Sequence, residues 1–342
     1  MYWFKNQFVT GLLSFLLIFT LIGCGEDEEE DEELLVASGT VYIVNGAAET
    51  ISVFEPETSE MNNDVVPVGK WPNDIKIAGS KVYVVNTGDN NVQIMDLALT
   101  EIDMIDIGEG TGPEKIDFVG YKAYVSCFNI NSVNVVDLAS GQVTKSIEVG
   151  TAPWGVAAAG GKVYVCNSNA VFDAAAGATA YGDGTVSVID SATDEVIATI
   201  DVDLNPTEIA VSGGNVIVMC TGNYDDITGK LTVIDPASDT VAQVIDLGAA
   251  PSGLAVSPNG KAYMTIFDGL ISVDIGSGTV AGPLEDFGNG FGLAFDGDGN
   301  GYISVPDWVG TGDDKLLVMD ASEALIGTYV PGGGASIVAV KE

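Results

Sequence analysis

Residues 82–86 read Val-Tyr-Val-Val-Asn, a short β-rich segment whose variants recur along most of the chain. The marker position of this segment recurs at Tyr42, Tyr83, Tyr124, Tyr164, Ile217, Tyr263 and Tyr302. Successive markers are 39 to 53 residues apart. A unit of about 40 residues that repeats seven times is typical of a β-propeller, in which each repeat forms one blade.

Each repeat contains short runs of alternating apolar and polar residues. In the second repeat they lie at 74–77, 81–85, 92–96 and 102–107. Such alternation predicts half-buried strands, so each blade should have four of them. A proline precedes the first strand in five repeats, where its missing N–H interrupts no strand ladder. These prolines are Pro72, Pro113, Pro153, Pro206 and Pro251.

The first repeat lacks an opening strand, and the end of the chain supplies a match. Residues 335–340 read Ala-Ser-Ile-Val-Ala-Val and belong to no repeat of their own. If they join the first blade, the ring closes and leaves no open sheet end. We therefore predict an all-β domain over residues 38–342, a seven-bladed propeller closed by its C-terminal strand. A linear solenoid is the alternative, but it would not need this permuted end.

The marker segments at 42–45, 83–86 and 164–167 resemble the YVTN repeat of YncE-like seven-bladed propellers. The resemblance covers residues 38–342 and is specific for the fold, whereas members of the family have diverse roles. One branch consists of outer-membrane surface lipoproteins that capture corrinoids and pass them to a transporter. Membership in that branch would imply a corrinoid ligand and a transporter partner, although no ligand-contact motif can be matched residue by residue.

The charge balance narrows the function classes. The 342 residues include 49 Asp and Glu against 12 cations, all of them lysine, and no histidine, for a net charge of -37. A nucleic-acid partner would require clustered Lys or Arg, so none is expected. Without His and Arg, the chain cannot form Ser-His-Asp systems, imidazole metal ligands or bidentate anion clamps. A non-enzymatic protein is favoured, with an Asp/Glu–metal hydrolase or lyase as an alternative.

The N-terminus has the pattern of an export signal. Lys5 precedes an apolar run from Gly11 to Ile22, and small Gly23 follows. Residues 21–24, Leu-Ile-Gly-Cys, resemble the lipobox of bacterial lipoproteins. That resemblance implies removal of residues 1–23 and lipidation of Cys24. An anchor helix with a chance cysteine is the alternative.

An acidic linker follows over residues 24–37. Residues 25–33 contain eight acids, and such a like-charge block repels itself and stays extended. It is either a solvated spacer or, by resemblance to some Gram-negative lipoproteins, a surface-export signal. We expect an exported lipoprotein of the bacterial outer membrane that is exposed at the cell surface and attached to the membrane only through its lipid.

Aromatic residues gather in the loops that would surround one end of a propeller channel. The loop at 167–185 is enlarged and holds two of them. Such rings offer a stacking surface for a flat ligand, a sugar or a corrin ring, while the alternative is that they fill gaps between blades. The predicted ligand-binding residues are Trp71, Trp154, Phe172, Tyr181, Tyr224, Phe291 and Trp308.

Residues 296–307 match most of a calcium-loop pattern, but a turn explains them better. Residues 257–260, Ser-Pro-Asn-Gly, occupy the same place in the previous repeat, and residues 302–305 must form a strand where a calcium loop needs a helix. We therefore expect no resident cofactor, although calcium bound weakly elsewhere stays open. Its candidate ligands have no diagnostic spacing: Asp203, Asp225, Asp226, Asp313 and Asp314.

Three cysteines besides Cys24 lie at the ends of second strands in consecutive repeats: Cys127, Cys166 and Cys220. Three thiols cannot all pair, and equivalent strands of neighbouring blades should be farther apart than the roughly 5.5 Å that a disulfide prefers between Cα atoms. Buried free thiols are therefore predicted.

These patterns together favour a monomeric propeller that binds a small molecule of the corrinoid or glycan class on its loop-rich face, without turnover. An outer-membrane transporter or another envelope protein is a further expected partner. The alternatives are a scaffold that presents a rigid face to a protein, and the metal-dependent enzyme named above.

Overall fold

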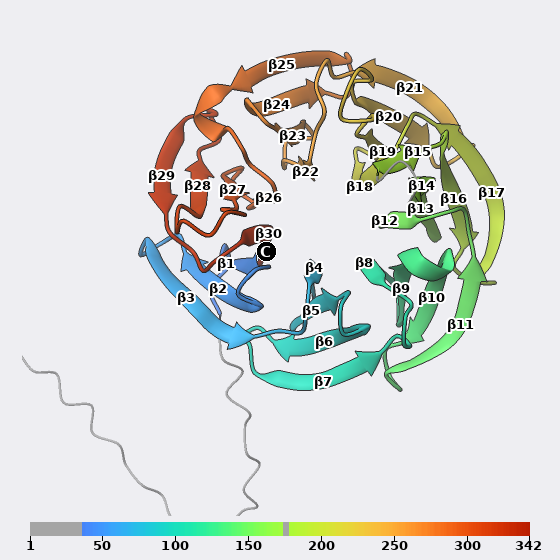
Figure 1. The fold of residues 1–342 in the computed structure, drawn as a ribbon, viewed down its shortest axis with the longest axis horizontal. Coiled ribbons are helices and arrows are strands. Elements are labelled where there is room, and N and C mark those ends of the chain that lie inside the picture. Colours follow the sequence, from blue (N-terminus) through green and yellow to red (C-terminus); the bar gives the residue numbers. More distant parts are fainter. Residues whose placement is uncertain (1–35, 174–177) are drawn as a thin grey trace, which may run out of the picture. The chain divides into compact units, whose positions relative to one another are not determined.

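The computed structural model describes residues 36–173 and 178–342, which form seven four-stranded antiparallel sheets in a ring (Figure 1). This confirms the predicted seven-bladed propeller. The predicted signal at 1–23, Cys24 and the linker up to residue 35 lie outside the described residues. Within the described part, no helix has the length and apolar character needed to cross a membrane.

The first three blades are continuous in sequence except for the closing strand. Blade 1 contains β30 (Ala335–Val340), β1 (Val41–Asn45), β2 (Thr50–Glu55) and β3 (Glu60–Pro67). Blade 2 contains β4 (Pro72–Ala78), β5 (Lys81–Asn86), β6 (Asn91–Asp96) and β7 (Glu101–Asp106). Blade 3 contains β8 (Pro113–Val119), β9 (Lys122–Cys127), the short helix η1 (Phe128–Ile130), β10 (Ser132–Asp137) and β11 (Gln142–Glu148).

The other four blades follow the same order. Blade 4 contains β12 (Pro153–Ala159), β13 (Lys162–Asn167), β16 (Gly184–Asp190) and β17 (Glu195–Val202). Blade 5 contains β18 (Pro206–Ser212), β19 (Asn215–Cys220), β20 (Lys230–Asp235) and β21 (Thr240–Asp246). Blade 6 contains β22 (Gly253–Val256), β23 (Ala262–Ile266), β24 (Gly269–Asp274) and β25 (Thr279–Leu284), followed by η2 (Glu285–Phe287). Blade 7 contains β26 (Leu293–Phe295), β27 (Gly301–Val305), β28 (Lys315–Met319) and β29 (Leu325–Tyr329).

The C-terminal strand closes the ring as predicted. β30 pairs antiparallel with β1, with Val340 opposite Val41 and Ile337 opposite Val44. Blade 1 is therefore built from both ends of the domain. Because every blade then has a neighbour on each side, no blade face is left without packing.

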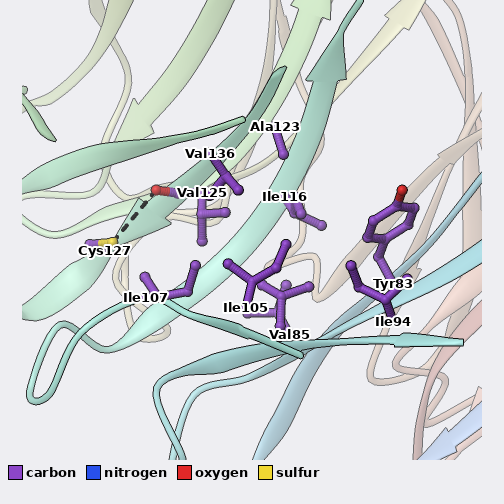
Figure 2. Close-up of a cluster of buried hydrophobic side chains, with 11 residues drawn as sticks. Tyr83, Val85, Ile94, Ile105, Ile107, Ile116, Ala123, Val125, Cys127 and Val136 are labelled. Carbon is purple, nitrogen blue, oxygen red and sulfur yellow. Dashed lines mark hydrogen bonds between the residues drawn. The ribbon is translucent and has the colours of Figure 1, made fainter. Parts of the chain in front are cut away.

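The core consists of apolar clusters packed between neighbouring blades. Figure 2 shows the cluster between blades 2 and 3, where Val85 and Ile105 meet Ile116 and Val125. All four side chains are at most 1% exposed. Two-sided burial explains why the second and third strands read as nearly continuous apolar runs.

A Lys-x-Tyr pair at the start of several second strands ties one blade to another. Lys122 Nζ lies 2.7 Å from Asp194 Oδ2, and the Tyr124 hydroxyl donates to Asp194 Oδ1 at 2.7 Å. Despite partial burial, which opposes ionisation, these hydrogen bonds hold the pKa of Asp194 below its ordinary value. The acceptor lies in the turn between the third and fourth strands of the next blade. The arrangement recurs as Lys162 and Tyr164 with Asp239, and as Lys261 and Tyr263 with Glu323.

Three local predictions have clear outcomes. The enlarged segment at 167–185, expected as a loop, contains a two-stranded hairpin of β14 (Ala170–Asp173) and β15 (Ala178–Tyr181). The turn at 296–300 is confirmed, since Asp296 accepts the backbone N–H groups of Asp298 and Asn300. The thiols of Cys127, Cys166 and Cys220 are free and buried, as predicted.

Candidate functional site

The inner strands of the seven blades surround a central cavity of about 980 Å³. These strands are β30, β4, β8, β12, β18, β22 and β26, which lie nearest the centre of the ring in Figure 1. Residues from the loop-rich face also line the cavity, including Phe128 and Tyr224. A concave site of this size with mixed polar and apolar walls is suited to a small molecule.

Aromatic rings form the mouth of this cavity in pairs. Trp154 packs edge-on against Phe128, with ring centroids 5.6 Å apart. Tyr181, from the hairpin of blade 4, lies 6.0 Å from Tyr224 of blade 5. Burial of the Tyr181 side chain raises the pKa of its phenol, with a further contribution from Tyr224. The hairpin thus brings one blade's aromatic residue against the next blade at the rim.

A third aromatic pair lies in blade 7. Phe291 lines the cavity, and the Trp308 ring packs edge-on against it at 5.7 Å. Trp308 itself is 62% exposed and does not line the cavity.

The structure brings together four of the seven predicted ligand residues. Trp154, Tyr181, Tyr224 and Phe291 line the cavity. Trp308 supports one of them, whereas Trp71 and Phe172 are 71% and 67% exposed and lie outside the lining.

The sequence reasoning did not select Phe128. This residue lies directly after the second strand of blade 3, in the same type of loop as the aromatic residues that were selected. Its place in that loop was the available signal.

One position of the inner strand governs the charge of the cavity wall. It lies two residues after the opening proline, and its occupants in blades 2, 3, 4 and 5 are Asp74, Lys115, Gly155 and Glu208. A Cβ at Gly155 would lie 2.7 Å from the carbonyl oxygen of Thr207, so blade 4 accepts only glycine here without a shift. Blades 6 and 7 also have glycine, Gly253 and Gly292, and in blade 1 the strand register places Ile337 there. The charged wall is therefore confined to one side of the cavity.

Lys115 lies between two carboxylates on this wall. Its Nζ is 3.1 Å from Glu208 Oε1 and 4.0 Å from Asp74 Oδ1. Burial opposes the charge, yet Glu208 and Asp74 together hold the pKa of Lys115 above its ordinary value. Asp74 also accepts the backbone N–H groups of Ile75 and Ile116, which links blade 2 to blade 3.

A second acid, Glu114, is buried beside this wall. It is 6% exposed and accepts a hydrogen bond from the side-chain amide of Asn73. Burial raises the pKa of Glu114 to about 7, against opposing contributions from Asn73 and Lys115. This carboxyl therefore titrates near neutral pH.

The predicted metal candidates have separate roles in the structure. Asp314 is buried and accepts the backbone N–H groups of Asp307, Gly334 and Ala335 at 2.9 to 3.0 Å, which ties β30 to blade 7. The Thr311 hydroxyl and neighbouring backbone amides lower the pKa of Asp307 to about 2.

The other candidates lie in exposed or paired positions. Asp313 accepts from the Thr311 hydroxyl, Asp203 pairs with Lys230, Asp226 accepts from Asn223, and Asp225 is exposed. Across residues 36–173 and 178–342, no three Asp, Glu or Cys side chains converge to hold a metal. Weak calcium binding stays a prediction.

Comparison with known proteins supports the fold. No family model and no curated protein matches the sequence. A solved structure of a functionally unknown protein from Desulfotomaculum acetoxidans DSM 771 is similar, with a TM-score of 0.66 and 16% identity over 89% of this chain and 99% of that one.

Two enzyme structures are also similar. Kuenenia stuttgartiensis hydrazine synthase has a TM-score of 0.65 and 20% identity, over 78% of this chain and 88% of that one. Dihydro-heme d1 dehydrogenase NirN in complex with DHE has a TM-score of 0.59 and 15% identity, over 91% of this chain and 77% of that one. At these identities the likeness shows a β-propeller, a fold that serves ligand-binding, protein-interaction and enzymatic roles.

Proposed function

We propose that this chain is a lipid-anchored propeller of the bacterial outer-membrane surface that binds a small molecule of the corrinoid or glycan class in its central cavity, without turnover. One observation carries the proposal: aromatic rings from four blades surround the mouth of a cavity of about 980 Å³ whose wall carries a charged cluster. Stacking on the rings and hydrogen bonding to the wall suit a ligand with a flat apolar surface and a polar edge.

Composition supports binding over catalysis. The chain has no His and no Arg, which most acid–base and anion-clamping active sites use. The likeness to hydrazine synthase and to the dihydro-heme d1 dehydrogenase is a likeness of fold and does not extend their activities to this chain. The lipobox resemblance at Cys24 supports the anchor.

The test is a thermal-shift screen of the mature full chain against cyanocobalamin, neutral oligosaccharides and calcium. A ligand that binds the folded state stabilises it by mass action and so raises the melting temperature. At a ligand concentration of 100 times the Kd, the free energy of unfolding rises by about 2.7 kcal/mol. The proposal expects a concentration-dependent rise with a corrinoid or an oligosaccharide. It fails if no member of either class raises the melting temperature at millimolar concentration.

A protein-interaction scaffold is the second candidate function. Loops after the second strands expose large apolar side chains around the mouth, including Ile130, Phe267 and Val309, which are 46%, 78% and 86% exposed. Clustered exposed apolar groups on one face are typical of interaction sites. If no small molecule binds, cross-linking in envelope extract should yield a partner that F267S and V309S lose, whereas the exposed Tyr121→Ser, outside these loops, keeps it.

A further inference from the structure

The Lys115–Glu208 ion pair belongs to the cavity rather than to the outer surface. Both side chains line the cavity, and they are 14% and 25% exposed. Blade 4 lies between the blades that supply them, and it has Gly155 at the corresponding position, directly after Trp154. Trp154, Lys115 and Glu208 line the same cavity, so a molecule held there on the Trp154 ring can also contact the pair.

The spacing of the pair decides which chemical groups it can bind. Because Lys115 Nζ and Glu208 Oε1 are only 3.1 Å apart, a charged ligand group near one atom is also close to the opposite charge of the pair. Attraction and repulsion then largely cancel, and the cost of removing the ligand charge from water remains. A hydroxyl or a carboxamide avoids this cost, since it can accept from the ammonium and donate to the carboxylate at once.

Apart from Lys76, the rest of the cavity offers little to offset a ligand charge. The opposite wall contributes the uncharged residues Ser252, Gly253, Gly292 and Ser336. Two further carboxylates of the lining already accept backbone N–H groups: Asp74 from Ile75 and Ile116, and Asp117 from Phe118 and Ala158. Lys76 is the one other cation of the lining, and within the described residues it has no carboxylate within 4.0 Å.

We infer that Lys115 and Glu208 determine the specificity of the cavity, and that they select a neutral ligand rich in hydroxyl or carboxamide groups over an anionic or cationic one. This inference rests on the proposed function, because it names the chemistry that the same cavity accepts.

Neutral probes and their charged derivatives test the inference by calorimetry on the mature full chain. Chitotetraose is neutral and its fully deacetylated form is cationic; cellotetraose is neutral and its uronate is anionic; cyanocobalamin is compared with its monocarboxylate. For each neutral probe that binds, the charged counterpart should bind at least tenfold more weakly. Glu208→Gln should then raise the affinity for the anionic probe, relative to that for the neutral one, by about tenfold. Lys115→Gln should raise the relative affinity for the cationic probe by the same factor. Lys70→Gln removes an exposed lysine outside the cavity lining; it is the matched control and should leave both ratios unchanged.

The ratio of charged-probe affinity to neutral-probe affinity separates a direct contact from a structural role, since a destabilised cavity binds neutral and charged probes alike more weakly. The inference is overturned if charged counterparts bind as tightly as neutral probes, if E208Q and K115Q leave the ratios unchanged, or if K70Q shifts them as much. If a neutral probe binds without charge discrimination, only this inference falls. If none of these neutral probes binds, the proposed function falls with it.

Discussion

Replacing Glu114 with glutamine should remove a pH-dependent loss of stability from the propeller. The pKa of this carboxyl is about 7 in the folded chain, against an ordinary value of 4.5. Below pH 4.5 both the folded and the unfolded states hold the proton, so the ionisation cost is absent. As pH rises from 4.5 to 7, the unfolded chain releases the proton while the folded chain keeps it, and the free energy of unfolding falls.

The size of this effect follows from the shift. A difference of about 2.5 pKa units corresponds to about 3 kcal/mol at 1.36 kcal/mol per unit. Glutamine cannot ionise, and its carbonyl oxygen can still accept the hydrogen bond from Asn73. E114Q should therefore match the wild type at pH 4.5 and exceed its stability at pH 8 by up to about 3 kcal/mol.

Urea unfolding followed by tryptophan fluorescence at pH 4.5, 6, 7 and 8 measures this difference. The matched control is Glu109→Gln, which removes one acid from an exposed position and should change stability little at any of these pH values. The reasoning is refuted if E114Q has the same effect on stability at pH 4.5 and pH 8, or if it destabilises the chain at pH 8.

Three further predictions follow from the packing. Tyr164→Phe removes a hydroxyl that donates to Asp239 at 2.7 Å, and chemical denaturation should show a loss of about 1.5 to 3 kcal/mol; unchanged stability would contradict a stabilising role for this hydrogen bond. Gly155→Ala places a methyl group 2.7 Å from the Thr207 carbonyl oxygen and should cost about 1 to 3 kcal/mol, whereas Gly297→Ala, with no atom within 4 Å of its added Cβ, should cost much less. Burial raises the pKa of the Cys220 thiol to about 12, so a thiol reagent at pH 8 should label the native chain far more slowly than the urea-unfolded chain; equal rates would contradict the buried state.

The ring architecture was predictable because each blade repeats the same local pattern. Strand alternation and the spacing of the markers required seven units, and residues 335–340 matched the one opening strand that was missing. The hairpin β14–β15 was not predicted, since its strands, Ala170–Asp173 and Ala178–Tyr181, are only four residues long and lie in an alanine-rich, glycine-containing insertion.

The candidate site was predictable only in part, because its members meet through the ring. Trp154 and Trp71 both adjoin a proline, but Trp154 follows Pro153 into the inner strand, whereas Trp71 precedes Pro72 and stays outside. That difference of two positions relative to the proline separates a cavity residue from an exposed one. The pair of Lys115 with Glu208 joins blades 3 and 5, and no local pattern in either repeat signals it.

Binding to two tryptophan variants tests the central claim most directly. Calorimetry with cyanocobalamin and chitotetraose should detect a ligand for the wild-type chain, and Trp154→Ala should weaken that binding at least tenfold, or by about 1.4 kcal/mol. Trp71→Ala removes an equal ring outside the cavity lining and should leave the affinity unchanged. Equal losses in the two variants, or no loss in W154A, would contradict a ligand site in the central cavity.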